Sequence, residues 1–362
     1  MRPDLPLSVL DVSPIASGET ATLALRASLE LARHVEALGF VRYWVAEHHN
    51  AGALACPAPE LMAAHLLAHT SHIRIGSGGV MLPNHPPLRI AEAFRVLHAL
   101  HPNRVDLGLG RAPGTDKRTA LLLRRVDASD FAAQVSELFG YFSDNEPPRE
   151  PFATSVRAIP SGVPRPPVWI LGTSTESGRF AGSSGLGFAA AHHISPDDAV
   201  PALLAYRESF VPSAAFPTPH AILAVSATCS DDPTVAEDLT RVANVSGLRF
   251  ARGLRDWPMP TFTEARTHAF DEEDEALLLA YAGRGFHGHT SEVVPKLVAL
   301  AEEARCDELM VMGNVPDRTV QRESFACVLR ALRRTTTADV AAAKSPTKSK
   351  LDSIIGPANS GE

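Results

Sequence analysis

The residues best suited to chemistry form a run of one carboxylate and two imidazoles, Glu47-His48-His49. Histidine titrates near neutral pH and serves as an acid, a base or a hydrogen-bond donor. Adjacent side chains at a strand end point in different directions, so at most two of the three share one pocket. The run predicts a catalytic centre, and the plain alternative is a polar histidine satisfied at a strand end.

A second group of polar residues is suited to holding a phosphate. Arg111 follows the run GLG, and an arginine beside exposed backbone amides is a good phosphate ligand. The run GTST at 172–175 opens a predicted helix, where free N–H groups favour an anion. The same hydroxyls could serve as simple N-caps. The glycine spacing is a poor match to the dinucleotide fingerprint GxGxxG, so we expect a phosphate-bearing cofactor on another fold.

Two further pairs stand out along the chain. Gly78-Gly79 lies inside a strand-like run, where glycine often marks the close approach of a ligand, although a bulge or kink explains it equally well. His192-His193 ends a later strand-like run and is a candidate for a substrate pocket. Histidines and carboxylates also suit a metal ion. The only His-x-His, at 287–289, falls in an irregular segment, so we expect no metal.

These residues need a scaffold that gathers strand ends, and an alternation of strand-like and helix-like runs predicts one. The apolar residues of the strand-like runs are nearly continuous, as in strands covered on both faces. These runs lie at 7–12, 42–46, 73–82, 104–109, 167–172, 186–191, 221–228 and 307–312. Helical periodicity lies at 20–38, 58–69, 88–100, 129–142, 175–184, 197–210, 291–304 and 317–334. Eight such units predict a (β/α)8 TIM barrel with its site at the C-terminal strand ends, and an open doubly wound sheet is the alternative.

The barrel is expected to be a single domain over residues 1–334. Two stretches interrupt the alternation, an insertion at about 143–166 and a longer one at about 252–290. The second is either a lid over the barrel mouth or a solvated excursion. Residues 335–362 lack periodicity and are expected to form a disordered tail. In the first helix, Leu23, Ala27, Leu31 and Leu38 are the predicted apolar stripe.

Composition excludes several other classes of protein. The 362 residues carry 34 basic and 41 acidic side chains, a net charge of −7, which argues against a nucleic-acid partner. No apolar run approaches the ~18–20 residues that span a membrane. The N-terminus carries no secretory pattern, and the four scattered cysteines fit free thiols. We expect a cytoplasmic protein.

Three runs closely resemble the bacterial-luciferase-like family of flavin-dependent monooxygenases. They are YWVAEHHN at 43–50, IRIGSGGVMLPNH at 73–85 and RVDLGLGRAPG at 104–114. The similarity is dense over about residues 5–125, and it returns at 167–172, 190–193 and 307–311. It is thin over 130–165 and 230–290.

The resemblance implies a (β/α)8 barrel that binds FMN, supplied in reduced form by a separate NAD(P)H-dependent flavin reductase. Such enzymes react reduced FMN with dioxygen to form a flavin 4a-hydroperoxide. This species then oxygenates an aldehyde, a ketone or another small organic molecule, such as a natural-product intermediate. Family members are commonly dimers, so a homodimer is expected.

The resemblance also implies roles for single residues. His48 matches the catalytic histidine near the reactive edge of the flavin, with Glu47 and His49 as further catalytic candidates. Gly78-Gly79 matches a backbone step, often a cis peptide, against which the ring packs. The implied phosphate ligands are Arg111, Gly172, Thr173, Ser174 and Ser177.

The chain also departs from the luciferases proper. Their reactive cysteine is Gly110 here and their phosphate-loop glutamate is Thr173, which points to the non-luminescent branch. Three alternatives stay open. One is a deazaflavin-dependent hydride-transfer enzyme, another is a non-catalytic flavin-binding relative, and the third is a metal-dependent hydrolase.

Overall fold

A closed parallel barrel forms the centre of the molecule in the computed structural model, which describes residues 5–123, 130–143 and 156–344. Its strands pair in the order β1-β2-β3-β4-β5-β6-β7-β9, and β9 returns to β1. The bounds are β1 Leu7–Asp11, β2 Arg42–Val45, β3 Arg74–Met81, β4 Val105–Gly110, β5 Val168–Gly172, β6 Gly187–Ala191, β7 Ala221–Ser230 and β9 Glu308–Met312. The predicted (β/α)8 barrel is confirmed, because the strands close into a ring.

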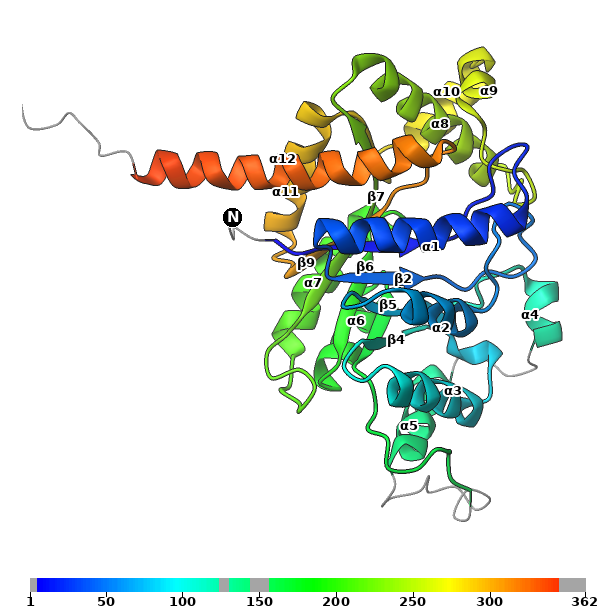
Figure 1. Cartoon of the computed structure of the whole chain (residues 1–362), viewed down its shortest axis with the longest axis vertical. Helices are drawn as coiled ribbons and strands as arrows, with labels where there is room; N and C mark the ends of the chain where they lie inside the picture. Colours follow the sequence, from blue (N-terminus) through cyan, green and yellow to red (C-terminus); the bar gives the residue numbers. More distant parts are fainter. Residues whose placement is uncertain (1–4, 124–129, 144–155, 345–362) are drawn as a thin grey trace, which may run out of the picture.

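Helices surround the barrel (Figure 1). The helices after successive strands are α1 Ala21–Leu38, α2 Pro59–His69, α3 Pro87–Leu100, α4 Lys117–Leu123, α5 Phe131–Phe142, α6 Thr175–Ser183, α7 Pro196–Ser209, α11 Thr290–Glu303 and α12 Arg318–Lys344. Local signals set their ends. Thr20 caps α1 by accepting a hydrogen bond from Leu23 N, and Gly39 ends it in the left-handed region, at φ 90°. Among the described residues, no helix has the length and apolar character needed to cross a bilayer.

A ninth strand lies in the segment that we expected to be an irregular lid. β8, Gly285–His289, pairs with the second half of β7, whereas β9 pairs with the first half. Before it come α8 Pro233–Ala251, α9 Phe262–Thr267 and α10 Glu272–Ala280. These three helices gather at one edge of the barrel, opposite α3 and α5 (Figure 1). Most of the 252–290 segment is therefore regular structure, and residues 252–260 form its irregular part.

The structure describes only part of the insertion at 143–166 and part of the expected C-terminal tail. The insertion at 143–166 lies between α5 and β5, and its residues 144–155 fall outside the described part of the chain. Arg95 anchors the remainder by donating hydrogen bonds to the carbonyls of Ala158 and Pro160. At the C-terminus, α12 continues to Lys344, so the helix passes residue 334, where the tail was expected to begin. Residues 345–362 lie outside the described residues.

Two apolar clusters form the core. The larger one lies between the strands and the surrounding helices, and the smaller one fills the barrel with side chains that include Leu10, Trp44, Trp169, Ile222 and Met310. On α1, Leu31 belongs to the outer core but Leu23 is 51% exposed, so the predicted stripe is wrong in part. The buried face instead carries Ala24, Ser28, Leu31, Ala32, Val35 and Glu36. Small residues on that face let the helix pack close to the barrel.

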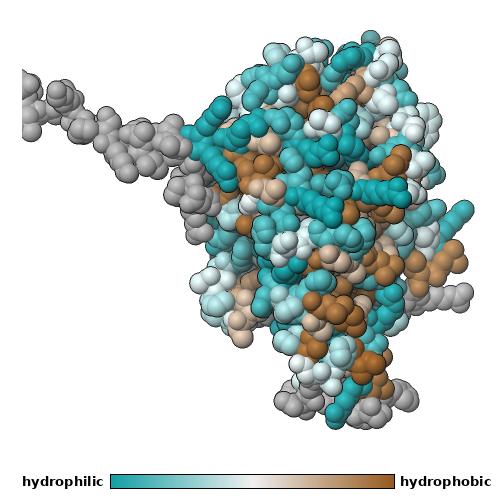
Figure 2. Space-filling model, viewed as in Figure 1, coloured by the Kyte–Doolittle hydropathy of each residue, from teal (hydrophilic) through white to brown (hydrophobic). Residues whose placement is uncertain are grey.

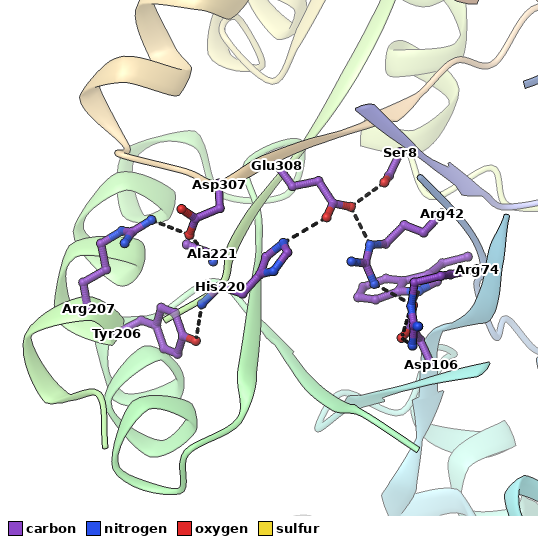
Figure 3. Close-up of polar contacts among 11 residues, drawn as sticks. Ser8, Arg42, Arg74, Asp106, Tyr206, Arg207, His220, Ala221, Asp307 and Glu308 are labelled. Atoms are coloured by element: carbon purple, nitrogen blue, oxygen red, sulfur yellow. Dashed lines mark hydrogen bonds and ion pairs between the residues drawn. The ribbon is translucent and has the colours of Figure 1, made fainter. Parts of the chain in front are cut away.

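A buried ion network closes the N-terminal end of the barrel (Figure 3). Arg42 donates hydrogen bonds to Glu308 and to Asp106, at 2.5 Å in each case. Arg74 also pairs with Asp106, and His220 Nε2 lies 3.0 Å from Glu308 Oε2. Both carboxylates are fully buried. Burial would raise the pKa of each carboxylate, but the Arg42 charge lowers it below the ordinary value, so both are ionised and paired.

Candidate active site

The C-terminal end of the barrel is lined by small residues on three neighbouring strands. Side chains alternate along a strand, and Trp44 and Ala46 belong to the cluster inside the barrel. Gly78 on β3 and Gly110 on β4 continue the inward-facing positions of their strands. Bulkier partly buried residues, such as Leu171 on β5 and Met312 on β9, lie elsewhere on the inner wall. The β3–β4 side of this end therefore presents backbone without side chains.

Glu47 is the structural centre of this end of the barrel. Its carboxylate is fully buried and accepts hydrogen bonds from His49 Nε2 and Asn84 Nδ2, both at 2.9 Å. It also accepts from His85 Nε2 at 2.9 Å and Met81 N at 3.0 Å. Burial would raise the pKa of Glu47, but these hydrogen bonds lower it below the ordinary value. The ionised carboxylate thus ties the end of β2 to the segment that follows β3.

His48 lies next to Glu47 on the chain and, by alternation, on the other face of the strand. Its main-chain N–H donates to Cys56 O, and its Nδ1 is buried without a hydrogen-bond partner among the described residues. Burial lowers the pKa of His48 below its ordinary value, against the opposing charge of Glu47. The imidazole is therefore neutral at neutral pH. His49, in contrast, is held by the Glu47 carboxylate.

His193 and His192 follow β6 at the same end of the barrel. His193 Nδ1 lies 3.2 Å from the carbonyl oxygen of Ala224, and burial lowers the pKa of this imidazole to about 4. The charges of His192 and His48 contribute to that shift, so both imidazoles lie within electrostatic range of His193. His192 is 4% exposed and stacks on Phe286, with ring centroids 5.6 Å apart. The structure thus brings His48 and His193 together from opposite parts of the sequence.

The Gly78–Gly79 peptide bond is cis. The pairing of β3 with β4 shifts register between Ser77 and Val80, so the bulge that we kept as the structural alternative is present. A Cβ atom on Gly78 would lie 2.7 Å from Leu10 Cδ1, and one on Gly79 would lie 2.9 Å from Gly108 O. Neither position has space for a side chain.

Arg111 and the start of α6 lie side by side because Gly110 and Leu171 are in register across β4 and β5. The Arg111 side chain is exposed and makes no hydrogen bond or ion pair with the described residues. Ser174 is the N-cap of α6 and accepts from Ser177 N at 3.3 Å, so the N-cap alternative is realised. Gly172 allows this turn, because a Cβ there would lie 2.5 Å from Ser177 Cβ. Thr173 is half-buried beside them.

The first turn of α6 also carries a carboxylate. Glu176 Oε1 accepts a hydrogen bond from Thr175 Oγ1 at 3.4 Å, and the main-chain N–H of Glu176 and the Ser174 hydroxyl nearby lower the pKa of this carboxyl below its ordinary value. An acidic group at a helix N-terminus is favoured by the helix dipole. The place where we expected a phosphate is therefore approached by a side-chain anion of the chain itself.

Sequence reasoning assigned no role to four participants at this end. Asn84 and His85 hold Glu47, yet they read only as the turn after a strand. His287 on β8 lies 2.8 Å from Thr228 Oγ1 on β7, and burial lowers its pKa to about 4. Arg255 lies near enough to His48 to lower the pKa of that imidazole. The glycine-rich run around His287 is typical of a loop, so the sequence alone does not predict strand β8 there.

No group of three or more His, Cys, Asp or Glu side chains suited to a metal ion occurs within the described residues. A cavity of about 260 Å³ lies at the opposite end of the barrel, against Arg42, Arg74, Asp106, Trp169 and His220. Its charged groups already pair with one another in the network of Figure 3. We therefore place the candidate active site at the C-terminal end.

A model of the luciferase-like monooxygenase family matches residues 6–301. The chain belongs to this family. A luciferase-like monooxygenase of Escherichia coli (strain K12) is 37% identical over 321 residues, which cover 88% of this chain and 94% of the relative. The uncharacterised protein YceB of Bacillus subtilis (strain 168) is 38% identical over 322 residues, which cover 88% of this chain and 97% of the relative.

Solved structures of luciferase-like proteins share the fold. Apo-MsnO8 matches with a TM-score of 0.81 at 32% identity and covers 90% of this chain and 98% of its own. The oxygenating constituent of 3,6-diketocamphane monooxygenase from Pseudomonas putida, in complex with FMN, has a TM-score of 0.67 at 14% identity, covering 91% and 98%. An F420-dependent secondary alcohol dehydrogenase has a TM-score of 0.62 at 15% identity, covering 91% and 99%. The last two likenesses concern the fold alone.

Proposed function

We propose that this luciferase-like monooxygenase uses reduced FMN and dioxygen to place one oxygen atom on a small organic substrate, such as an aldehyde or a ketone. One observation carries the proposal. A neutral imidazole, His48, and an unpaired guanidinium, Arg111, lie at the same end of the barrel, with bare backbone on the strands that carry them. This combination suits a flat ring with a phosphorylated tail.

The residues present fit FMN on three counts. Arg111 supplies a charged donor beside the α6 N-terminus, where Thr173, Ser174 and Ser177 offer hydroxyl and amide hydrogens. Gly78–Gly79 and Gly110 carry no side chain that would obstruct a ring, and atoms of Leu10, Gly108 and Met81 fill the places where their Cβ atoms would lie. His48 has a buried Nδ1 without a partner among the described residues, which places an unused polar atom at the reactive end.

Bound reduced flavin would supply the reaction with dioxygen, and the protein supplies position and protons. His48 is neutral at neutral pH, so it can take a proton at the reacting edge and return it later, or donate a hydrogen bond there. Glu47 does not reach substrate in our scheme, because its two oxygens are taken up by neighbouring donors. We assign Glu47 and His49 to positioning the β2 end and His48 to catalysis. Residues 252–260, which lie against the β1 and β2 loops, are placed to exclude water.

A separate flavin reductase and dioxygen are the partners that this scheme requires. The expected homodimer remains a prediction, to be tested by sedimentation. Hydrophobic side chains reach the surface in the view of Figure 2, and Leu61 on α2 and Leu100 on α3 are 67% and 68% exposed. Such residues are common at subunit contacts when they lie close together.

The test loads the chain with reduced FMN or with reduced deazaflavin, admits dioxygen, and follows carbonyl substrates by mass spectrometry. We expect oxygenated product with reduced FMN. In His48→Ala, the dissociation constant for FMN should stay within about threefold, whereas product formation should fall by about 100-fold or more, as for loss of a general acid or base. His65→Ala, on the exposed face of α2, is the matched control.

Three results would contradict the proposal. Turnover with reduced deazaflavin and none with FMN would favour hydride transfer, the alternative that the F420-dependent neighbour of the same fold keeps open. Unchanged product formation in His48→Ala would remove that residue from catalysis. FMN binding without turnover of any substrate would favour a non-catalytic flavin carrier.

A further inference from the structure

His193 has a fixed orientation at the mouth of the barrel. It lies in the turn that follows β6, two residues after Ala191, the last residue of that strand. Ala191 is in register with Ala224 of β7, and the Ala224 carbonyl lies 3.2 Å from His193 Nδ1. A carbonyl oxygen can only accept a hydrogen bond. The proton of the ring is therefore on Nδ1, and Nε2 carries a lone pair.

The lone pair on Nε2 is available at physiological pH. Burial, together with the charges of His192 and His48, lowers the pKa of His193 to about 4, so the ring stays neutral. Among the described residues, no donor makes a hydrogen bond to Nε2, whereas Nδ1 is occupied. The His193 side chain is therefore uncharged and offers no N–H to the mouth of the barrel. Its Nε2 atom is a hydrogen-bond acceptor whose direction is fixed by the hydrogen bond from Nδ1 to Ala224 O.

His48 complements this acceptor with a donor. Its Nδ1 is buried and has no partner among the described residues. A buried N–H without an acceptor is less favourable than a buried lone pair without a donor, so the proton of the neutral ring belongs on Nε2. One end of the barrel thus carries an acceptor on β6 and a donor on β2, near each other and without a direct hydrogen bond between them.

We propose that His193 Nε2 accepts a hydrogen bond from the substrate, and that the substrate carries a hydroxyl or N–H group close to the atom that is oxygenated. The inference rests on the proposed function, since it assumes that the substrate enters this end of the barrel. It names a chemical class: small organic molecules with a hydrogen-bond donor next to the reacting group. Analogues in which a methyl group replaces the donor leave this lone pair unpaired in the complex and bind less well.

The experiment compares matched probes on the FMN-loaded protein. The probes are hydroxyacetone against butan-2-one, and indole against indene, because each pair keeps about the same size and loses a donor that lies next to the reacting group. Binding is followed by calorimetry and by the flavin absorbance. We expect the hydroxyl and N–H probes to bind about tenfold more tightly than their partners in the wild-type protein, the selectivity typical of one hydrogen bond to a buried group.

Two substitutions separate the two ring nitrogens. In His193→Asn, the side-chain amide can still donate to Ala224 O but offers no acceptor at the position of Nε2. In His193→Gln, the longer amide can place its oxygen where Nε2 was. We expect the preference for hydroxyl and N–H probes to disappear in His193→Asn and to persist in His193→Gln. FMN affinity should be unchanged in both, and His65→Asn on the surface of α2 is the control.

The ¹⁵N NMR signals of His193 give a readout without any ligand. They should show a protonated Nδ1 and a bare Nε2 from about pH 6 to about pH 8. A proton on Nε2, equal affinity for the two members of each probe pair, or no binding of any donor-bearing probe would each overturn the proposal. A large loss of FMN affinity in both variants would assign the acceptor to the cofactor instead. If the chain binds no flavin, the proposed function fails, while the NMR signals and probe binding to the flavin-free chain still judge His193.

Discussion

Glu47 and His48 are adjacent in the sequence but have separate tasks, because alternation along a strand turns them to different faces. Glu47 is fully buried and accepts four hydrogen bonds, so it holds the end of β2 against the segment that follows β3. His48 has an unused nitrogen and a lowered pKa. A carboxylate next to an imidazole therefore does not by itself indicate a catalytic pair, and only the partners of each atom distinguish a reacting group from a positioning group.

Arg111 offers a direct test at the residue scale. Its guanidinium is exposed and lacks a partner among the described residues, so its removal should leave the fold intact. We expect Arg111→Ala to weaken FMN binding by about 1.5–3 kcal/mol, the size of a hydrogen bond to a charged group. Fluorescence titration of FMN measures the change.

The control for this prediction is Arg26→Ala, because Arg26 is an exposed arginine on the outer surface of α1. The control variant should bind FMN like the wild-type protein. An Arg111→Ala protein with unaltered FMN affinity would exclude Arg111 from the phosphate site.

At the scale of whole elements, the start of α6 is the feature with the clearest functional consequence. Its N-terminal amides favour an anion, and the Glu176 carboxylate already interacts with them. A phosphate that binds there has to displace this side chain, which is exposed and free to turn toward solvent.

Replacement of Glu176 by Gln should therefore strengthen FMN binding. We expect about a two- to fivefold gain in affinity at low ionic strength, because one negative charge near the helix start is removed. The gain should shrink as salt is added, since exposed charges are screened. FMN titrations at two salt concentrations test this prediction. Glu303→Gln, at the C-terminal end of α11, is the matched control substitution. Weaker binding in Glu176→Gln would show that the phosphate does not bind at α6.

The elements were predictable from sequence where their patterns are strong. The eight closing strands are buried on both faces, so their continuous apolar runs identified them. The sequence did not predict β8, because its sequence GFHGH is short, rich in glycine and polar. The buried face of α1 is shifted by about one residue from the predicted face, because Ala24 and Ser28 pack against the barrel where Leu23 and Ala27 were expected to pack. Close packing against the barrel, which a helical pattern alone does not encode, decides which face turns inward.

The candidate site was predictable in its ingredients and less so in its connections. The residues after the strands were identifiable because a parallel barrel gathers the carboxyl ends of its strands. The hydrogen bonds that distinguish His48 from Glu47, and the bond that orients His193, depend on Asn84, His85 and the Ala224 carbonyl. These partners lie far away in the sequence and have no local signature.

For the molecule as a whole, the two ends of the barrel have opposite character. The N-terminal end is closed by ionised side chains that satisfy one another, with Arg42 also stacked 4.5 Å from the Trp169 ring centroid. The C-terminal end carries neutral imidazoles and an unpaired arginine. Charges at the closed end serve stability, whereas the open end keeps its polar atoms available for ligands.

Arg42→Ala tests the closed end. The substitution leaves the buried Glu308 and Asp106 without their shared cation, so we expect a loss of about 3–5 kcal/mol in the free energy of unfolding. Arg33→Ala, which breaks an exposed pair with Glu30, should cost less than about 1 kcal/mol. Urea unfolding compares the two variants, and equal losses would contradict this role for the network.

The same network predicts how stability depends on pH. The folded-state pKa values of Asp106 and Glu308 are lowered, so their contribution is complete above the ordinary carboxylate range, about pH 4, and is lost as the pH falls through the folded values. The difference between wild type and Arg42→Ala should therefore be largest near neutral pH and shrink in acid. A difference that grows below about pH 4 would contradict the assignment.

β7 makes its barrel-closing contacts to β6 and β9 with residues Ala221–Ser226, and it meets β8 only from Ser226 onward. The strand pairs that close the barrel therefore include no residue between 231 and 289. This annex, residues 231–289, extends β7 through β8 and also contacts the loops after β1 and β2. Chimeras that exchange the annex between relatives should keep their barrels and transfer the selectivity that His287 and its neighbours confer. One contiguous piece of chain could in this way change the substrate while the residues proposed to bind FMN stay in place.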